Sequence, residues 1–285
     1  MANIRLRSPA LLPILVLLAG CGATPGLAGS PTSPSSAQAL KLPRLLPDDD
    51  ERIPAGYYKE AEGKEGKALV AALHRIVAGH MDLGYDRARD VLFGTIADAD
   101  GDDRVEDLYT GEERDGIRDR KTAYSKGMNT EHTWPQSLGA QGAAQADLHH
   151  LQPSDIKING SRGSLPYGEV VGAPFSSFPG RDGDSVMGNS RDGILVFQPR
   201  PSVRGDIARG LLYFYTTYAV TSMGALNTPK PDLRNFRFET PVLLKWNQAD
   251  PPDAMERARN EAVFRAQGNR NPYVDRPGWA DKIGL

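Results

Sequence analysis

Cysteine is almost missing from this chain, since Cys21 is the only one among 285 residues. A domain that follows Cys21 can therefore contain neither a disulfide framework nor a metal site built on thiolates. The lack of cysteine does not determine the cellular compartment, because a protein can work in an oxidising environment without depending on disulfides. What is excluded is a fold that needs them.

The chain also lacks an excess of positive charge and a long apolar run. Its formal net charge is -2, and the first twenty residues carry Arg5 and Arg7 and no acid, so that their removal leaves -4 (-2 minus 2). Bulk charge thus does not mark a binder of nucleic acid, and any site for a polyanion must be a local patch. The apolar run Leu11–Leu18 is interrupted by Pro13 and is too short to span a bilayer comfortably.

The first 21 residues are predicted to be an export signal. After a positive start and the short apolar core, Leu18-Ala19-Gly20-Cys21 places small residues directly before the cysteine. This tetrad resembles the cleavage box of bacterial lipoproteins, in which the cysteine becomes the lipidated N-terminus; the alternative is a plain secretory peptide. Gly22 follows instead of aspartate, so the common inner-membrane retention signal is absent. We expect a lipoprotein of the outer membrane or cell surface, anchored through Cys21, or a secreted protein.

The rest of the chain divides into a tether and a domain. Residues 22–52 are rich in Pro, Ser, Ala and Thr, and predict a disordered tether. Residues 53–285 fit one domain of roughly 230 residues, which we expect to be a monomer. Helices mixed with a few short strands favour a mostly helical α+β domain over a parallel sheet.

Periodicity and capping signals place several elements. Apolar residues three and four apart predict helices over residues 65–80 and 206–223. Thr240-Pro241, a capping residue before a proline, predicts the start of another helix, and Gly268 ends one that begins at Pro252. Residues 174–192 are full of Gly, Pro, Ser and Asp, and predict a loop.

Two charged stretches allow more than one interpretation. Residues 98–107 resemble a calcium-binding loop, but the glycine is fourth instead of sixth and the twelfth residue is Tyr109 instead of glutamate. A solvated loop is therefore favoured there. Residues 112–127 mix charges of both signs, and they either face a phosphate or form an exposed loop.

Residues 128–169 concentrate the side chains that can carry chemistry. The window holds a carboxylate, three of the five histidines of the chain, an amide and a guanidinium. These are Glu131, His132, His149, His150, Asn159 and Arg162. Such a density of reactive groups predicts a catalytic site.

Hydrolysis of a phosphodiester bond needs residues of these types. A base must take a proton from the attacking water, a hard cation must neutralise charge on the phosphoryl oxygens, and a positive group must hold the non-bridging oxygens. His132 can be the base, since its unperturbed pKa of about 6.5 lies close to working pH. Glu131 and Asn159 offer oxygens suited to Mg²⁺, and Arg162 can clamp the phosphate.

Local structure can bring these groups together. Adjacent residues of a strand point to opposite faces, so Glu131 and His132 share a substrate only if the chain bends directly after them. Leu148–Leu151 predicts a second short strand, and Asp155 can cap a following helix that carries Asn159. Two strands and a helix would then form a small metal-holding module.

Each motif taken alone also has an ordinary interpretation. The His149-His150 pair can be structural, with one ring buried and one exposed. Asn159-Gly160 is first of all a turn signal. Their order and spacing together favour the functional interpretation.

The order of these motifs resembles the bacterial endonuclease I family of exported, non-specific nucleases with a ββα-metal, or His-Me finger, active site. The resemblance covers about residues 55 to 280. Its central segments are Asn129–Gln136, Asp147–Leu151, Asn159–Arg162 and Pro166–Glu169. Similar outer segments are Tyr57-Tyr58, Tyr109–Gly111, Arg204–Arg209, Leu243–Trp246 and Gln267–Pro272.

The resemblance implies a role for each site residue. His132 would be the general base, and Glu131 and Asn159 would bind a divalent metal, Mg²⁺ or another such as Ca²⁺ or Mn²⁺. His149 would also lie in the active site. The implied activity is sequence-non-specific cleavage of DNA, and of RNA as well, that leaves 5′-phosphate ends.

Two departures from the family pattern matter. Cysteine-rich members are held by disulfides, which this domain lacks. Some members carry an arginine between the glutamate-histidine pair and the second strand, whereas residues 133–156 contain no Arg or Lys. The phosphate clamp then falls to Arg162, Arg204 or Arg209, and we favour Arg162.

Two other functions remain open from the residues themselves. One is a metal-dependent hydrolase of another phosphodiester or ester. The other is an exported lipoprotein without enzyme activity, in which the three clustered histidines and Glu131 hold a structural zinc ion. Tightly retained zinc would favour the structural zinc site. A weak dependence on Mg²⁺ would favour the nuclease, in which His132 must not bind the metal.

Overall fold

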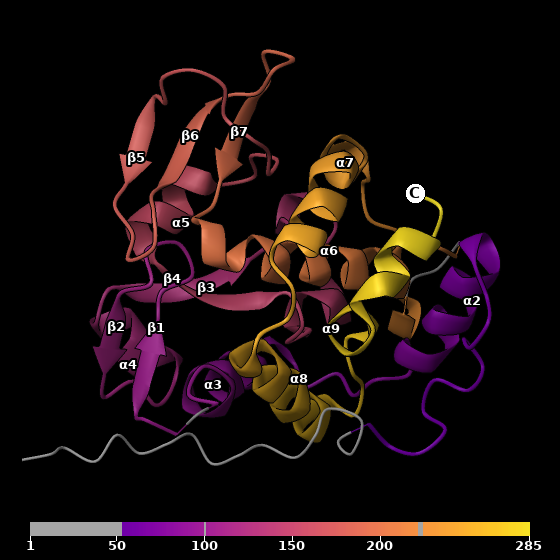
Figure 1. Cartoon of the computed structure of the whole chain (residues 1–285). Helices are drawn as coiled ribbons and strands as arrows, with labels where there is room; N and C mark the ends of the chain where they lie inside the picture. Colours follow the sequence, from indigo (N-terminus) through magenta and orange to yellow (C-terminus); the bar gives the residue numbers. More distant parts are fainter. Residues whose placement is uncertain (1–52, 100, 222–224) are drawn as a thin grey trace, which may run out of the picture. The chain divides into compact units, whose positions relative to one another are not determined.

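The computed structural model describes residues 53–99, 101–221 and 225–285 (Figure 1). The predicted export signal and tether lie outside the described residues. The described part is a single α+β domain of helices and three small antiparallel sheets, and this confirms the predicted fold class. No helix of the described part is long and apolar enough to cross a membrane.

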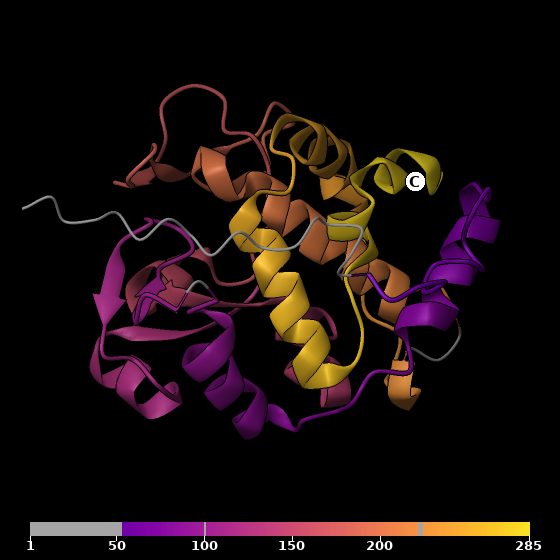
Figure 2. The ribbon, with the colours of Figure 1, turned by 60° about the horizontal axis from the view of Figure 1, so that its bottom comes forward.

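The elements follow one another with short connections. The helices are α2 (Gly66–Val77), α3 (Tyr85–Val91), α4 (Arg120–Ser125), α5 (Ile156–Arg162), α6 (Arg204–Tyr218), α7 (Arg234–Ala249), α8 (Ala254–Gln267) and α9 (Pro272–Asp275). The strands are β1 (Arg104–Glu106), β2 (Glu113–Asp115), β3 (Met128–His132), β4 (Leu151–Asp155), β5 (Ser176–Phe178), β6 (Ser185–Asn189) and β7 (Leu195–Gln198). In the turned view of Figure 2, α2 (indigo) again lies at the opposite edge from the magenta strands.

Helix α6 is the centre of the helical part, and α2, α7 and α9 pack around it. Most of its residues are buried, because apolar or small side chains occupy nearly every side instead of one stripe. The ring of Trp134, just after β3, stacks on Phe214 with the centroids 4.5 Å apart, which fixes the end of the strand on this helix. The predicted helix ran to residue 223, but α6 ends at Tyr218.

Strands β3 and β4 pair in antiparallel register, with Glu131 opposite Gln152. The prediction of a strand over 148–151 is wrong, because β4 begins only at Leu151. A turn occupies the preceding residues. The side-chain carboxylate of Asp147 accepts the backbone N–H of His149, and the backbone carbonyl of Asp147 accepts the backbone N–H of His150. His149 therefore precedes the strand instead of lying on it.

The cap predicted for the next helix is confirmed. The side chain of Asp155 accepts the backbone N–H groups of Lys157 and Ile158 at the start of α5. Asn159 consequently lies on α5, directly after β4, and the two strands and the helix form one contiguous module.

The predicted loop over residues 174–192 is wrong in part. Strands β5 and β6 lie within it and pair with β7 in a three-stranded antiparallel sheet. Many of their side chains are exposed or only partly buried, so no alternation of apolar and polar residues marks them in the sequence. Ser185 ties this sheet to the domain, since its hydroxyl donates to the carbonyl of Tyr109 and accepts the N–H of Arg200.

The helix predicted to start at Thr240 begins earlier, at Arg234, and contains Pro241. The hydroxyl of Thr240 donates to the carbonyl of Phe236 four residues back, as it does inside a helix and not at a cap. Proline removes a backbone donor there, but packing of α7 along α6 outweighs this cost. The helix that ends at Gly268 is confirmed as α8, with the φ angle of Gly268 at 86°.

The two ambiguous charged stretches are partly ordered. In the first, the carboxylate of Asp98 accepts the N–H of Asp103, and β1 begins one residue later. The second, residues 112–127, forms β2 and the short helix α4 instead of a continuous loop.

Candidate active site

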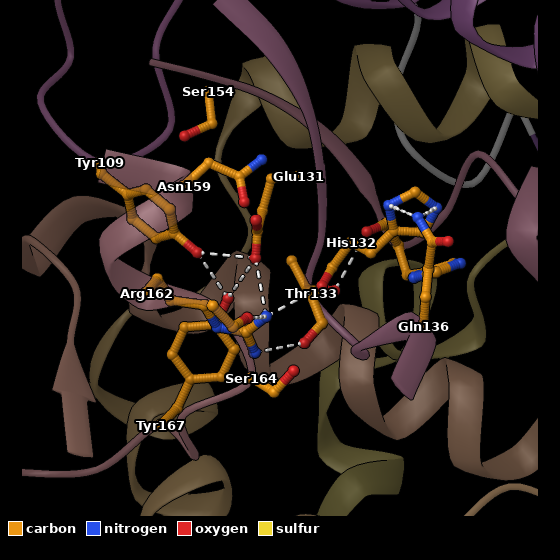
Figure 3. Close-up of polar contacts among 12 residues, drawn as sticks. Tyr109, Glu131, His132, Thr133, Gln136, Ser154, Asn159, Arg162, Ser164 and Tyr167 are labelled. Carbon is orange, nitrogen blue, oxygen red and sulfur yellow. Dashed lines mark hydrogen bonds and ion pairs between the residues drawn. The ribbon is translucent and has the colours of Figure 1, made fainter. Parts of the chain in front are cut away.

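Glu131 lies near the end of β3, and its carboxylate is almost fully buried. One oxygen, Oε1, accepts the hydroxyl of Tyr109 at 3.0 Å and Nη1 of Arg162 at 2.9 Å (Figure 3). The hydroxyl of Tyr167 lies 2.8 Å from that of Tyr109 and completes the cluster. Within the described part of the chain no hydrogen-bond donor reaches the other oxygen, Oε2. Hydrogen bonds thus hold the carboxylate through Oε1, and Oε2 keeps its lone pairs for another partner.

Asn159 presents an oxygen to the same place. Its Nδ2 donates to Oδ1 of Asn129 at 2.8 Å and to the carbonyl of Thr130 at 3.2 Å, which fixes the amide. In Figure 3 the side-chain oxygen of Asn159 points toward Glu131. An amide oxygen and a carboxylate oxygen that face each other without a donor repel, and a hard cation between them removes that repulsion.

These two groups fit a magnesium ion better than a zinc ion. Among the described residues, no group of three or more His, Cys, Asp or Glu side chains is arranged to hold a metal. Magnesium is commonly bound by one or two protein oxygens, with water and substrate phosphate filling the remaining positions. Glu131 and Asn159 supply that number.

His132, the next residue, is buried on the other side of the strand. Its Nε2 lies 3.1 Å from the carbonyl of Gln145, which can only accept, so Nε2 carries the proton and Nδ1 carries the lone pair. The amide of Gln136 donates to Nδ1 at 3.3 Å. Burial, with His150 nearby, lowers the pKa of His132 to about 3. The imidazole is neutral, which is the form that accepts a proton.

The other two histidines of the window do not converge on Glu131. Nε2 of His149 lies 3.1 Å from the carbonyl of Asn269, and its ring packs on Tyr213. Nε2 of His150 donates to the carbonyl of Ala144, and its ring centroid is 5.5 Å from that of His132. His150, rather than the predicted His149, is therefore the histidine beside His132. The proposed four-ligand zinc cluster is not formed.

Arg162 is buried, with 1% of its surface exposed. Besides Glu131, Nη1 contacts the carbonyl of His132 at 3.0 Å, and Nη2 donates to the carbonyl of Thr133 at 2.8 Å. Its guanidinium also lies over the ring of Tyr167, 4.4 Å from the centroid. This guanidinium holds Glu131 in place and, in this arrangement, does not reach outward as the predicted phosphate clamp.

A sequence model of endonuclease I matches residues 65–278, three quarters of the chain. The chain belongs to the endonuclease I family. It is therefore a nuclease, an enzyme that hydrolyses phosphodiester bonds.

Individual relatives agree with this family. An extracellular ribonuclease of Bacillus amyloliquefaciens is 38% identical over 241 residues, covering 80% of this chain and 77% of that protein. An extracellular ribonuclease of Bacillus subtilis (strain 168) is 34% identical over 271 residues, covering 90% and 86%. An extracellular deoxyribonuclease of Aeromonas hydrophila is 26% identical over 132 residues, covering 46% and 50%.

Three polar residues of this endonuclease I site were not assigned a role from the sequence. Tyr109 and Tyr167 hold Glu131, and Asn129 orients Asn159. All three lie in segments that resemble the family, so the motifs marked them. Their function could not be deduced, because Tyr109 is 22 residues and Tyr167 is 36 residues from Glu131 in the chain.

A second buried carboxylate supports the tyrosine cluster and makes stability depend on pH. Oε1 of Glu239 accepts the N–H of Tyr167 at 2.7 Å, and burial raises the pKa of Glu239 to about 7. The unfolded chain releases this proton near pH 4.5. Between these two values the folded state holds a proton that the unfolded state has lost, so stability falls as pH rises through this window.

We expect Glu239→Gln to remove that loss, because glutamine keeps the accepting oxygen and cannot ionise. The variant should be more stable than the wild type by about 1–3 kcal/mol above pH 7, with little difference near pH 5. Urea unfolding at both pH values measures this. If the free energy of unfolding changed equally with pH in the two proteins, Glu239 would be ionised in the folded state.

Proposed function

We propose that this nuclease is an exported, divalent-metal-dependent endonuclease that cleaves RNA and DNA without sequence specificity and leaves 5′-phosphate ends. The observation that carries the proposal is the pair of facing oxygens on Glu131 and Asn159 at the end of β3, where His132 follows Glu131. Relatives named as extracellular ribonucleases, and one named as an extracellular deoxyribonuclease, support export and both substrates.

Each residue has one task in this proposal. Glu131 and Asn159 hold the metal ion, Mg²⁺ or another divalent cation such as Ca²⁺ or Mn²⁺, which neutralises charge that develops on the phosphoryl oxygens. Nδ1 of His132 takes the proton from the attacking water as the P–O3′ bond breaks, and the departing 3′-oxygen takes a proton from solvent water. The carbonyl of Gln145 keeps the other proton of the ring on Nε2 and fixes the ring. Arg162 acts on the substrate only through Glu131, which it positions.

The proposal also covers the state of the protein. The chain acts as a monomer, and Cys21 attaches it to the outer membrane or cell surface when the export signal is processed as a lipoprotein signal. Without lipidation the enzyme is secreted. Mass spectrometry of the exported protein distinguishes a lipidated Cys21 from a free one.

The test uses RNA and plasmid DNA with Mg²⁺ or with EDTA, and the variants Asn159→Ala and Asn159→Asp. We expect cleavage of both substrates with Mg²⁺ and none with EDTA. Asn159→Ala should need at least about 10-fold more Mg²⁺ for half-maximal activity, because it loses one of the two protein ligands. Asn159→Asp keeps an oxygen at that position and should retain activity at wild-type metal concentrations.

The product ends test the chemistry separately. Fragments with 5′-phosphates should accept label from polynucleotide kinase only after phosphatase treatment. Cleavage that persists in EDTA, or that is unaffected by Asn159→Ala at limiting Mg²⁺, would contradict the proposed metal role. A wild-type protein that leaves both substrates intact with every divalent metal would contradict the proposed function as a whole.

A further inference from the structure

A cleft of about 320 Å³ lies beside the catalytic strand. Its walls are residues 128–130 of β3, together with α3 and α4, which lie next to each other below β3 in Figure 1. Three cationic side chains and an exposed aromatic ring line it. These are Arg89, Arg120, Lys121 and Tyr124.

The cleft adjoins both halves of the proposed catalytic machinery. Asn129, one of its lining residues, accepts the hydrogen bond that orients Asn159. On the other side, the ring centroid of Tyr85 lies 5.5 Å from that of His132, and Arg89 lies over the ring of Tyr85 at 4.2 Å. A strand bound at the proposed metal site can therefore continue into the cleft.

Two of the three cations of the cleft are held in ion pairs. Arg89 pairs with Asp86, and Arg120 pairs with Asp86 and Asp90, so that the two acids largely neutralise the two arginines. Lys121, by contrast, is exposed and forms no ion pair of 4.0 Å or less among the described residues, with the Asp119 carboxylate as a longer-range electrostatic partner. Lys121 is thus the cation of the cleft whose charge is least neutralised at short range.

Tyr124 is placed to work with this lysine. It follows Lys121 by three residues on α4, so both side chains lie on the same side of the helix. Its side chain is 70% exposed, one of the largest exposures of an apolar or aromatic residue in the described chain. An exposed ring beside an exposed cation is the combination with which proteins bind single-stranded nucleic acid, stacking the base and pairing the phosphate.

We propose that this cleft is a substrate subsite, in which Tyr124 stacks on the base of a nucleotide next to the scissile bond and Lys121 pairs with its phosphate. This inference rests on the proposed nuclease function and adds a substrate preference to it. Stacking requires an unpaired base, so single-stranded RNA or DNA binds better than a duplex. Neither group reads base edges, which is consistent with cleavage at any sequence.

Binding measured in EDTA tests the subsite without turnover. The probe is a fluorescent single-stranded oligonucleotide of about ten nucleotides, followed by anisotropy. Tyr124→Ala should weaken its binding by about 5- to 100-fold, and Tyr124→Phe should restore it. Lys121→Ala should lower the slope of log affinity against log salt concentration by about 0.7, the contribution of one phosphate contact on a single strand.

Two matched control variants each remove an exposed lysine or an exposed aromatic ring from another part of the surface. Lys67→Ala takes an exposed lysine from α2, on the opposite edge of the domain in both views, and Phe175→Ala takes an exposed ring from beside β5. Neither should change binding beyond about 2-fold, since a remote charge is screened by salt. With a duplex probe, Tyr124→Ala should have a smaller effect than with the single strand.

The outcomes separate this inference from the function on which it rests. If the wild type cleaves nucleic acid with metal, but Tyr124→Ala and Lys121→Ala bind the oligonucleotide like the two controls, the cleft is not a subsite and the proposed function stands. If the wild type neither binds nor cleaves, the proposed function fails, and the subsite fails with it. Both side chains are exposed, so circular dichroism of the variants should match that of the wild type.

Discussion

Replacement of His132 by alanine is expected to lower the rate of RNA and DNA cleavage by about 10²- to 10⁴-fold, the usual contribution of a general base. Alanine cannot accept the proton that Nδ1 is placed to accept. The proposed metal ligands Glu131 and Asn159 do not depend on the imidazole for their hydrogen bonds, so metal binding should persist. Initial rates with Mg²⁺, together with the metal concentration for half-maximal activity, measure both effects.

His74→Ala provides the matched control for this experiment. His74 lies on α2, where Nδ1 contacts the carbonyl of Thr216, and it has no contact with the site. Its removal should leave the rate within about 2-fold of the wild type while costing the hydrogen bond to Thr216. If His132→Ala cleaves nearly as fast as His74→Ala, another group takes the proton, and His150 is the next to examine because its ring lies beside that of His132.

Replacement of Arg162 by methionine is expected to destabilise the protein by about 3–5 kcal/mol, because it leaves the Glu131 carboxylate buried without a counter-charge. Burial already raises the pKa of Glu131, and Arg162 is the main group that lowers it again. Without Arg162 the carboxyl group holds its proton more tightly and becomes a poorer metal ligand. The variant should therefore need more Mg²⁺ for activity as well as less urea for unfolding.

Two further variants make the Arg162 result specific. Glu131→Gln combined with Arg162→Met should recover most of the lost stability, since no charge is left unpaired. Arg200→Met removes an arginine that is similarly buried and paired with Glu106 and Asp182, away from Glu131. It should lower stability and leave the metal requirement unchanged. If Arg162→Met instead keeps full stability and only raises KM for RNA, Arg162 contacts the substrate phosphate.

Local signals were sufficient for the module that carries the chemistry. Trp134 and Pro135 end β3, Asp155 caps α5, and Gly268 stops α8, because each of these effects depends on residues within one turn of the chain. The spacing of Glu131, His132 and Asn159 follows from these boundaries. The local structure around these residues could therefore be predicted without the tertiary structure, and the resemblance of the motifs predicted the family, which the family match confirms.

Elements whose local signal was missing or misleading were misplaced. Strands β5 and β6 have mixed, partly exposed side chains, and the pairing of β5 with β6 and of β6 with β7 is what makes them strands. Helix α7 contains Pro241 at a place where local rules put a start, and packing on α6 carries the helix through it. In both cases contacts distant in sequence outweigh the intrinsic preference of the segment.

The sequence by itself determined which residues are available for catalysis and in what order they occur, since residue type and local spacing are properties of the chain. Only the tertiary structure decided what each group does. It buries Arg162 against Glu131, turns His149 toward Asn269, and brings Tyr109 and Tyr167 to the same carboxylate oxygen. The physical reason is that burial and hydrogen-bond partners set the charge and orientation of a side chain, and these partners come from segments far away in the chain.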